Sequence, residues 1–246
     1  MLALIRSVLH MAWMVITVMP WTLAVLLVSL FSRRAAWWTA VNWFQVVMWG
    51  TRVILGVRFK VLGYDNLPLG KSSAAVLLSK HQSTLETLLL PTLMPHPLAF
   101  VFKRELLKIP FFGWSMARLD MIHINRESRT EAMKHVIDQG CRLLSQGVWV
   151  IMFPEGTRIP RGQKGTYQTA GSRLAVQSGA PVIPIAVATA QCWPREGFVK
   201  HPGVVTVSIG PALPSEGRDP KALMREAEAW IEAEMRRIDP EVYPQI

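Results

Sequence analysis

The stretch AAVLLSKHQSTLETLLL, residues 74–90, decides the fold of this chain. It opens with a short apolar run, residues 74–79, which has the length and the residue types of a buried β-strand. From residue 83 onward the apolar residues recur at helical spacing. Lys80 and His81 lie between the two patterns. The stretch therefore predicts a strand that leads through a polar loop into a helix, with His81 at the mouth of the strand.

The same alternation of strands and helices continues through the chain. Short β-branched runs separated by turn residues predict further strands at 58–64, 98–103, 121–124, 148–153, 182–188 and 204–210. Helical spacing of apolar residues covers 83–94, 128–145, 167–178 and 219–237. This alternation predicts an α/β fold with a largely parallel sheet covered by helices. In such folds the chemistry collects in the loops at the strand ends.

The first 57 residues differ in composition from the rest of the chain. Asp65 is the first acidic residue, and six of the 10 tryptophans precede it. Residues 11–31 are apolar and long enough to cross a bilayer, which takes about 20 residues. The tryptophan-rich run 35–50 suits the headgroup zone. We therefore expect residues 1–57 to form an N-terminal hydrophobic helical pair that anchors an α/β domain, residues 58–246, to a membrane.

Two other interpretations of the N-terminal segment stay open. One is a cleavable signal peptide, although the apolar run is longer than such peptides usually have and no small-residue cleavage site follows cleanly. The other is a buried helical hairpin of a soluble protein. For the membrane interpretation, insertion across the bilayer and insertion into one leaflet both fit the composition.

The charge and the cysteine content of the chain limit the kinds of partner and cofactor that we expect it to bind. The 246-residue chain has a formal net charge of +10, which favours an anionic partner. Together with the apolar segment and Arg33-Arg34, this charge indicates an anionic membrane surface rather than nucleic acid. The two cysteines lack metal-site spacing, and no nucleotide-binding glycine fingerprint is present. We expect neither a metal nor a cofactor.

His81 and Glu86 admit two interpretations. A carboxylate at the start of the helix can accept a hydrogen bond from one imidazole nitrogen, which leaves the other nitrogen as a general base. The segment Ser83-Thr84-Leu85-Glu86 is also a capping box, with Ser83 as N-cap and Glu86 at the third helical position. On this stretch alone the two interpretations are about equally supported.

Cations follow three of the other predicted strands. They are Lys103 at the end of 98–103, Arg126 after 121–124, and Arg158 in FPEGTR, residues 153–158. Arginine binds phosphate through two parallel hydrogen bonds, and glycine lets backbone N–H groups approach an oxyanion closely. One rim that carries a base and several such groups indicates a site for a phosphorylated hydroxyl compound.

These motifs together resemble a known family, the glycerolipid acyltransferases, and most closely the 1-acylglycerol-3-phosphate (lysophosphatidic acid) acyltransferases. Four family blocks occur in order: His81-x4-Glu86; Lys103 to Gly113 with Ile124-Asn125-Arg126; Phe153 to Arg158; and Val182-Ile183-Pro184-Ile185. The family's usual acid is aspartate, and this chain has Glu86 instead. Its arm is one methylene longer, which a modest adjustment of backbone or rotamer can accommodate.

The resemblance implies acyl transfer from an acyl thioester, either acyl-CoA or acyl-carrier protein, to the free 2-hydroxyl of lysophosphatidic acid, giving phosphatidic acid. His81 would be the general base and Glu86 would orient it. The implied substrate-binding residues are Lys103, Arg126, Glu155, Gly156, Thr157 and Arg158. Glu155 would either touch the substrate or orient Arg158. The implied location is the inner (cytoplasmic) membrane, with the active site on the cytoplasmic side.

Two other functions are compatible with parts of the pattern. The same chemistry could use glycerol-3-phosphate, another lysophospholipid or a lyso-aminolipid as the acceptor, since cationic loops suit several of these. A membrane-attached protein that binds anionic lipid without catalysis would explain the charge and the tryptophans. It would not explain a histidine–acid pair beside FPEGTR.

Overall fold

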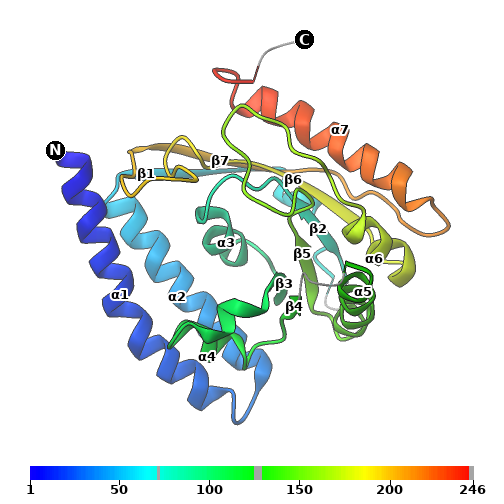
Figure 1. Cartoon of the computed structure of the whole chain (residues 1–246), viewed down its shortest axis with the longest axis horizontal. Coiled ribbons are helices and arrows are strands. Elements are labelled where there is room, and N and C mark those ends of the chain that lie inside the picture. Colours follow the sequence, from blue (N-terminus) through cyan, green and yellow to red (C-terminus); the bar gives the residue numbers. More distant parts are fainter. Residues whose placement is uncertain (71–72, 125–128, 244–246) are drawn as a thin grey trace.

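The computed structural model describes residues 1–70, 73–124 and 129–243, and it contains one seven-stranded sheet (Figure 1). The strands are β1 (Val57–Leu62), β2 (Val76–Ser79), β3 (Leu98–Lys103), β4 (Ile122–Ile124), β5 (Trp149–Met152), β6 (Val182–Ala188) and β7 (Gly203–Ile209). Their order is β1-β7-β6-β2-β5-β3-β4. Every neighbouring pair is parallel except β6 and β7. The predicted α/β fold with a largely parallel sheet is confirmed.

The helices also follow the predicted order. They are α1 (Leu2–Val28), α2 (Arg33–Val53), α3 (Leu85–Leu89), α4 (Phe112–Met116), α5 (Arg129–Ser145), α6 (Ala170–Ser178) and α7 (Pro220–Ile238). Short 3-10 helices occupy Tyr64–Asn66, Leu90–Thr92 and Arg104–Lys108. The helix predicted over 83–94 is divided between α3 and the 3-10 turn after it, because Pro91 interrupts the α-helical hydrogen bonds.

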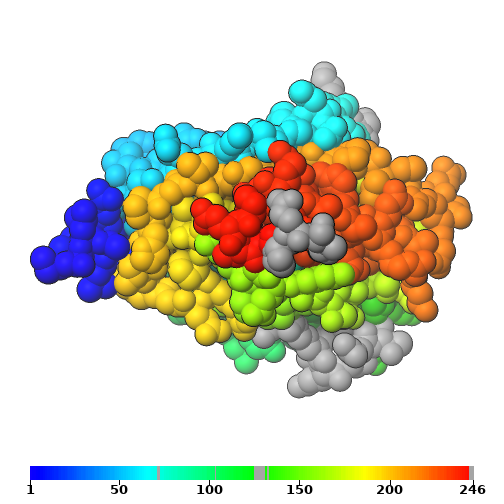
Figure 2. All heavy atoms as spheres, turned by 90° about the horizontal axis from the view of Figure 1, so that it is seen from above, coloured from blue at the N-terminus to red at the C-terminus, as the bar shows by residue number. Residues whose placement is uncertain are grey.

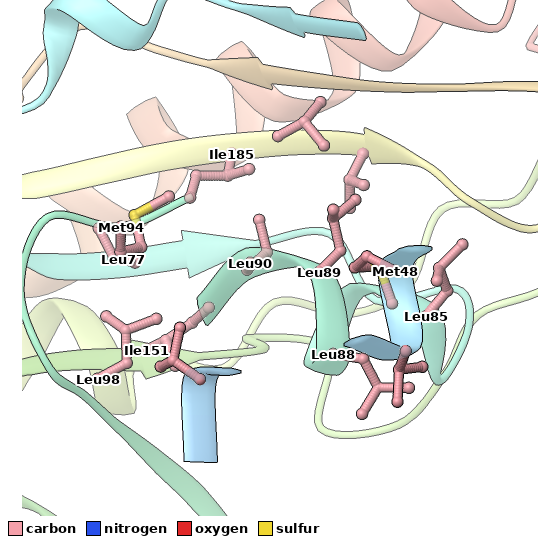
Figure 3. Close-up of a cluster of buried hydrophobic side chains, with 14 of the residues drawn as sticks. Met48, Leu77, Leu85, Leu88, Leu89, Leu90, Met94, Leu98, Ile151 and Ile185 are labelled. Carbon is pink, nitrogen blue, oxygen red and sulfur yellow. The ribbon is translucent and has the colours of Figure 1, made fainter. Parts of the chain in front are cut away.

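Each face of the sheet carries an apolar core. Helices α2 and α3 cover one face, with α1 packed on the outer side of α2, and α5, α6 and α7 cover the other face (Figure 1). Strand β2 is buried throughout; Leu77 joins the first core, and Val76 and Leu78 join the second, as the alternation of side chains along a strand requires. Figure 3 shows part of the first core, where leucines of the α3 region meet Met48 of α2.

Helix α1 presents an apolar side that the rest of the chain leaves exposed. Its most apolar 18-residue window has a mean hydropathy of 2.1 and is 17% buried, so the helix is long and apolar enough to cross a membrane. Exposed large hydrophobic residues include Leu4, Ile5, Val8, Leu9, Val15, Ile16, Leu23 and Leu27. Helix α2 packs beside α1 and belongs to the core of the sheet.

Helix α1 begins nine residues before the predicted apolar run, because polar residues near its start are buried and have partners. The Ser7 hydroxyl accepts a hydrogen bond from the backbone N–H of Lys200 at 2.8 Å. His10 Nε2 lies 2.9 Å from the Thr51 hydroxyl, and its ring meets Trp193 edge-on. These contacts fix the start of α1 to α2 and to the loop between β6 and β7.

Candidate active site

His81 lies just past the carboxyl end of β2, the central strand of the sheet, and the segment after β5 holds it at three points. The His81 N–H donates to Glu155 Oε2 at 2.9 Å, and its carbonyl oxygen accepts from the Ile159 N–H at 2.7 Å. The imidazole stacks on Phe153, with ring centroids 4.0 Å apart and an interplanar angle of 18°. The FPEGTR segment therefore fixes both the backbone and the ring plane of His81.

The predicted His81–Glu86 contact is present in the structure. His81 Nδ1 lies 2.9 Å from Glu86 Oε1, and the carboxylate is fully buried. Because an ionised carboxylate only accepts hydrogen bonds, this contact assigns the proton to Nδ1. Within the described residues, Nε2 has no hydrogen-bond partner, and the side chain is 16% exposed. The nitrogen that can accept a proton is therefore the one without a hydrogen-bond partner among the described residues.

The same carboxylate also holds the start of helix α3. Glu86 Oε1 accepts from the backbone N–H groups of Gln82 at 2.6 Å and Ser83 at 2.7 Å. The Ser83 hydroxyl in turn accepts from the Leu85 N–H at 3.1 Å. Helix α3 begins at Leu85 with Thr84 as N-cap, one residue later than the predicted capping box, so Glu86 is its second residue and not its third. Glu86 nevertheless holds the backbone before the helix and contacts His81 at the same time, and the two interpretations of Glu86 do not exclude each other.

The Thr189 hydroxyl holds the other oxygen of this carboxylate. It donates to Glu86 Oε2 at 2.8 Å and is itself fully buried at the end of β6. With both oxygens held, the longer arm of glutamate has one fixed orientation toward His81. Thr189 was not among the predicted site residues, and its place directly after a predicted strand was its only signal in the sequence.

The Glu155 side chain faces the interior and not the open side of the site. Besides the His81 N–H, it accepts a hydrogen bond from the Lys80 ammonium, Nζ to Oε1, at 2.7 Å, and both side chains are fully buried. Burial raises the pKa of the Glu155 carboxyl above its usual value, and the Lys80 charge partly offsets this effect. The sequence suggested that Glu155 touches substrate or orients Arg158, whereas its contacts are with Lys80 and His81.

Arg158 lies beside the loop that follows His81. Its Nη1 donates to the Thr84 hydroxyl at 3.2 Å and to the Arg195 carbonyl oxygen at 3.1 Å. Within the described part of the chain, no carboxylate lies in salt-bridge range of Arg158. Gly156 and Thr157 are exposed in the turn before it, where the φ of +67° at Gly156 favours glycine.

Two predicted cations lie wholly or partly outside the described part of the structure. Lys103 is the last residue of β3 and pairs in register with Ile124 of β4; its side chain lies outside the described part of the structure. Arg126 also lies outside the described residues. Because β3 and β4 run parallel to β5 and β2, their carboxyl ends lie at the same edge as His81 and Arg158.

The structure adds a buried polar cluster that the sequence analysis did not predict. The Lys80 Nζ contacts Glu232 Oε1 of α7 at 2.7 Å and the Gln163 carbonyl oxygen at 3.1 Å, in addition to Glu155. The Tyr167 hydroxyl donates to the same Glu232 oxygen at 2.8 Å. In the ranges that the structure describes, no group of three His, Cys, Asp or Glu side chains is arranged to hold a metal ion.

Comparison with known proteins identifies the family. Residues 58–188 match the family model described as Acyltransferase. A 1-acyl-sn-glycerol-3-phosphate acyltransferase of Pseudomonas aeruginosa is 43% identical over 241 residues, covering 96% of this chain and 92% of that protein. The human 1-acyl-sn-glycerol-3-phosphate acyltransferase alpha is 31% identical over 172 residues, covering 69% of this chain and 59% of that protein.

A solved structure shares the fold. The 1-acyl-sn-glycerophosphate (LPA) acyltransferase from Thermotoga maritima superposes with a TM-score of 0.80 at 23% identity, covering 96% of this chain and 95% of that one. The family model and the Pseudomonas aeruginosa relative confirm the resemblance inferred from the four sequence blocks. The apolar N-terminal helix agrees with the membrane association that the sequence predicted. The chain is an acyltransferase that belongs to the 1-acyl-sn-glycerol-3-phosphate acyltransferase family.

Proposed function

We propose that this acyltransferase moves a fatty acyl group from an acyl thioester to the free 2-hydroxyl of lysophosphatidic acid, giving phosphatidic acid. The names of the relatives in Pseudomonas aeruginosa and human support this acceptor. The observation that carries the proposal is the 2.9 Å contact between His81 Nδ1 and Glu86 Oε1, because it leaves Nε2 as the available base.

In the proposed reaction, His81 Nε2 takes the proton of the acceptor hydroxyl as that oxygen attacks the thioester carbonyl carbon. The tetrahedral intermediate then collapses, the carbon–sulfur bond breaks, and the leaving thiolate takes the proton from the imidazolium. Glu86 stabilises the imidazolium while it exists. General-base assistance of this kind contributes about 10²–10⁴ in rate. The mechanism requires no metal and no cofactor.

The acceptor phosphate is assigned to Arg158, and Lys103 and Arg126 remain the further phosphate-binding residues that the sequence motifs predict. The described contacts of Arg158 are with a hydroxyl and a carbonyl oxygen, which are neutral acceptors. Its positive charge therefore stays available for a phosphate, and a charge-assisted pair would be stronger than either neutral contact. Glu155 is assigned to holding His81 and not to the substrate.

The donor and the location belong to the same proposal. Either acyl-CoA or acyl-carrier protein would supply the thioester. The active site would face the cytoplasm, the compartment that holds these thioesters, at the inner membrane. The exposed apolar side of α1 supports attachment to that membrane, and the net charge of +10 suits its anionic lipids.

The proposal is tested by measuring thiol release and phosphatidic acid formation with detergent-purified protein and a long-chain acyl-CoA. The acceptors to compare are lysophosphatidic acid, glycerol-3-phosphate and another lysophospholipid, and acyl-carrier protein is the second donor. We expect turnover with lysophosphatidic acid that disappears in His81→Ala. Preference for another acceptor would contradict the substrate assignment, and full activity of His81→Ala would contradict the mechanism.

A further inference from the structure

The C-terminal helix and the segment after it contact both residues that flank His81 in the chain. Glu232 Oε1 of α7 accepts from Lys80 Nζ at 2.7 Å, and the Tyr243 hydroxyl accepts from Gln82 Nε2 at 2.7 Å. A third contact joins this segment to the loop after FPEGTR, where Asp239 accepts from Arg161 Nε at 2.9 Å. Figure 2 shows the C-terminal segment, in red, lying against the yellow-green segment of that loop.

These contacts are inside the protein. Lys80 and Gln82 are fully buried, and Glu232, Asp239 and Tyr243 are 5%, 3% and 4% exposed. Water therefore cannot readily replace a lost partner, so each side chain depends on the one it faces. Gln82 Oε1 has no hydrogen-bond partner among the described residues, so the hydrogen bond from Gln82 Nε2 to Tyr243 is what holds this side chain. Hydrogen bonds in such buried networks favour one arrangement of the side chains that make them.

Two side chains, Lys80 and Glu155, connect Glu232 of α7 to the backbone of His81. Lys80 Nζ has three N–H groups and three acceptors: Glu155 Oε1, Glu232 Oε1 and the Gln163 carbonyl oxygen. Its orientation is therefore fixed, and it holds the Glu155 carboxylate whose second oxygen accepts the His81 N–H. Burial, with the nearby Glu155 and Glu232, raises the pKa of Tyr167 above its usual range, so this hydroxyl stays a hydrogen-bond donor to Glu232.

We propose that Glu232 and Tyr243 are positioning residues for acyl transfer: by holding Lys80 and Gln82, they fix the backbone of His81 and hence the direction of its imidazole. The proposal rests on the proposed function, since it concerns the same base. It gives a role in the reaction to helix α7, which lies outside the residues matched by the family model.

The first test is Glu232→Gln, which keeps the size of the side chain and an acceptor for Lys80 but removes the charge. We expect kcat to fall about 10²-fold with unchanged KM for both substrates, because small displacements of a catalytic group cost about this much. The matched control is Glu228→Gln on the same helix. Glu228 pairs with Lys164 at 2.6 Å at the surface and touches neither flanking residue, so its kcat should be unchanged.

Tyr243→Phe is the second variant, and it decides the question if Glu232→Gln does not fold. It removes only the hydroxyl that holds Gln82, so kcat should fall by about fivefold, the equivalent of one neutral hydrogen bond. A purely structural role would lower the melting temperature and leave kcat per folded molecule unchanged. If both folded variants keep the wild-type kcat, the positioning role is refuted.

A readout independent of turnover separates this inference from the proposed function. Nitrogen NMR of ring-labelled histidine, with the His81 signals identified from their loss in His81→Ala, reports which ring nitrogen carries the proton. We expect protonation at Nδ1 in the wild type and a mixture of tautomers in Glu232→Gln. If the wild type lacks lysophosphatidic acid turnover and Glu232→Gln still changes the tautomer of His81, the result would support positioning while contradicting the proposed function. If the wild type is active and the variants keep both its kcat and its His81 tautomer, the positioning role would be overturned and the proposed function would stand.

Discussion

Glu86 has two roles, orienting His81 and holding the start of α3, and only the first requires its negative charge. The variant Glu86→Gln therefore separates the two roles. In this variant the remaining oxygen can still accept from the N–H groups of Gln82 and Ser83, as Oε1 does now. The new amide N–H can donate to the Thr189 hydroxyl, which now donates to Oε2. The contacts that hold the start of α3 therefore survive, and the loss is the charge beside His81.

The size of the effect follows from the geometry. Imidazolium and carboxylate would be in contact, with Nδ1 and Oε1 at 2.9 Å. Opposite charges about 4 Å apart near a protein surface attract by about 4 kcal/mol. This attraction is absent before proton transfer and present in the transition state, so its loss should lower kcat by about 10³-fold. The KM for lysophosphatidic acid should stay unchanged, because the acceptor phosphate is assigned to other residues.

The assay is phosphatidic acid formation by purified Glu86→Gln, with wild type and His81→Ala measured in parallel. The melting temperature of each protein confirms that the fold is retained. A folded Glu86→Gln with wild-type kcat would refute the base-orienting role and leave Glu86 with its helix-capping contacts alone. Loss of folding would show instead that the charge is needed for the local structure.

Three further predictions concern other parts of the molecule. Arg158→Ala should raise the KM for the phosphorylated acceptor by about 10–100-fold, the value of one charge-assisted hydrogen bond, and an unchanged KM would exclude phosphate binding. Gly63→Ala should destabilise the fold far more than Gly217→Ala, as measured by urea unfolding. Both glycines have positive φ, but a Cβ at residue 63 would lie 2.1 Å from the Ile209 carbonyl oxygen, whereas a Cβ at residue 217 would meet open space. Burial raises the pKa of Cys192 to about 11, so in a Cys141→Ser protein, which lacks the half-buried thiol, Cys192 should react with a thiol reagent at pH 8 only on unfolding. Rapid labelling of Cys192 in that native protein would contradict its buried position.

Local patterns predicted the strands well because each is a short apolar run between turn residues. The direction of β7 was harder to predict, since the chain returns antiparallel to β6 without a crossover helix. The His81–Glu86 contact could be predicted because the two residues are five positions apart. The partners Thr189 and Glu232 could not be predicted, because they lie more than 100 residues further along the chain and no local pattern marks them.

The polar residue pair near the start of α1 has a consequence for how the enzyme meets its acceptor. Ser7 and His10 bind the rest of the protein, while the other side of the same helix is apolar and exposed. If the exposed side of α1 enters the membrane as proposed, these contacts would tie the helix to the catalytic sheet, and the site would keep a constant height above the bilayer. An enzyme held in this way encounters lipid acceptors by lateral diffusion in two dimensions. Its rate would then follow the mole fraction of acceptor in the membrane and not the bulk concentration.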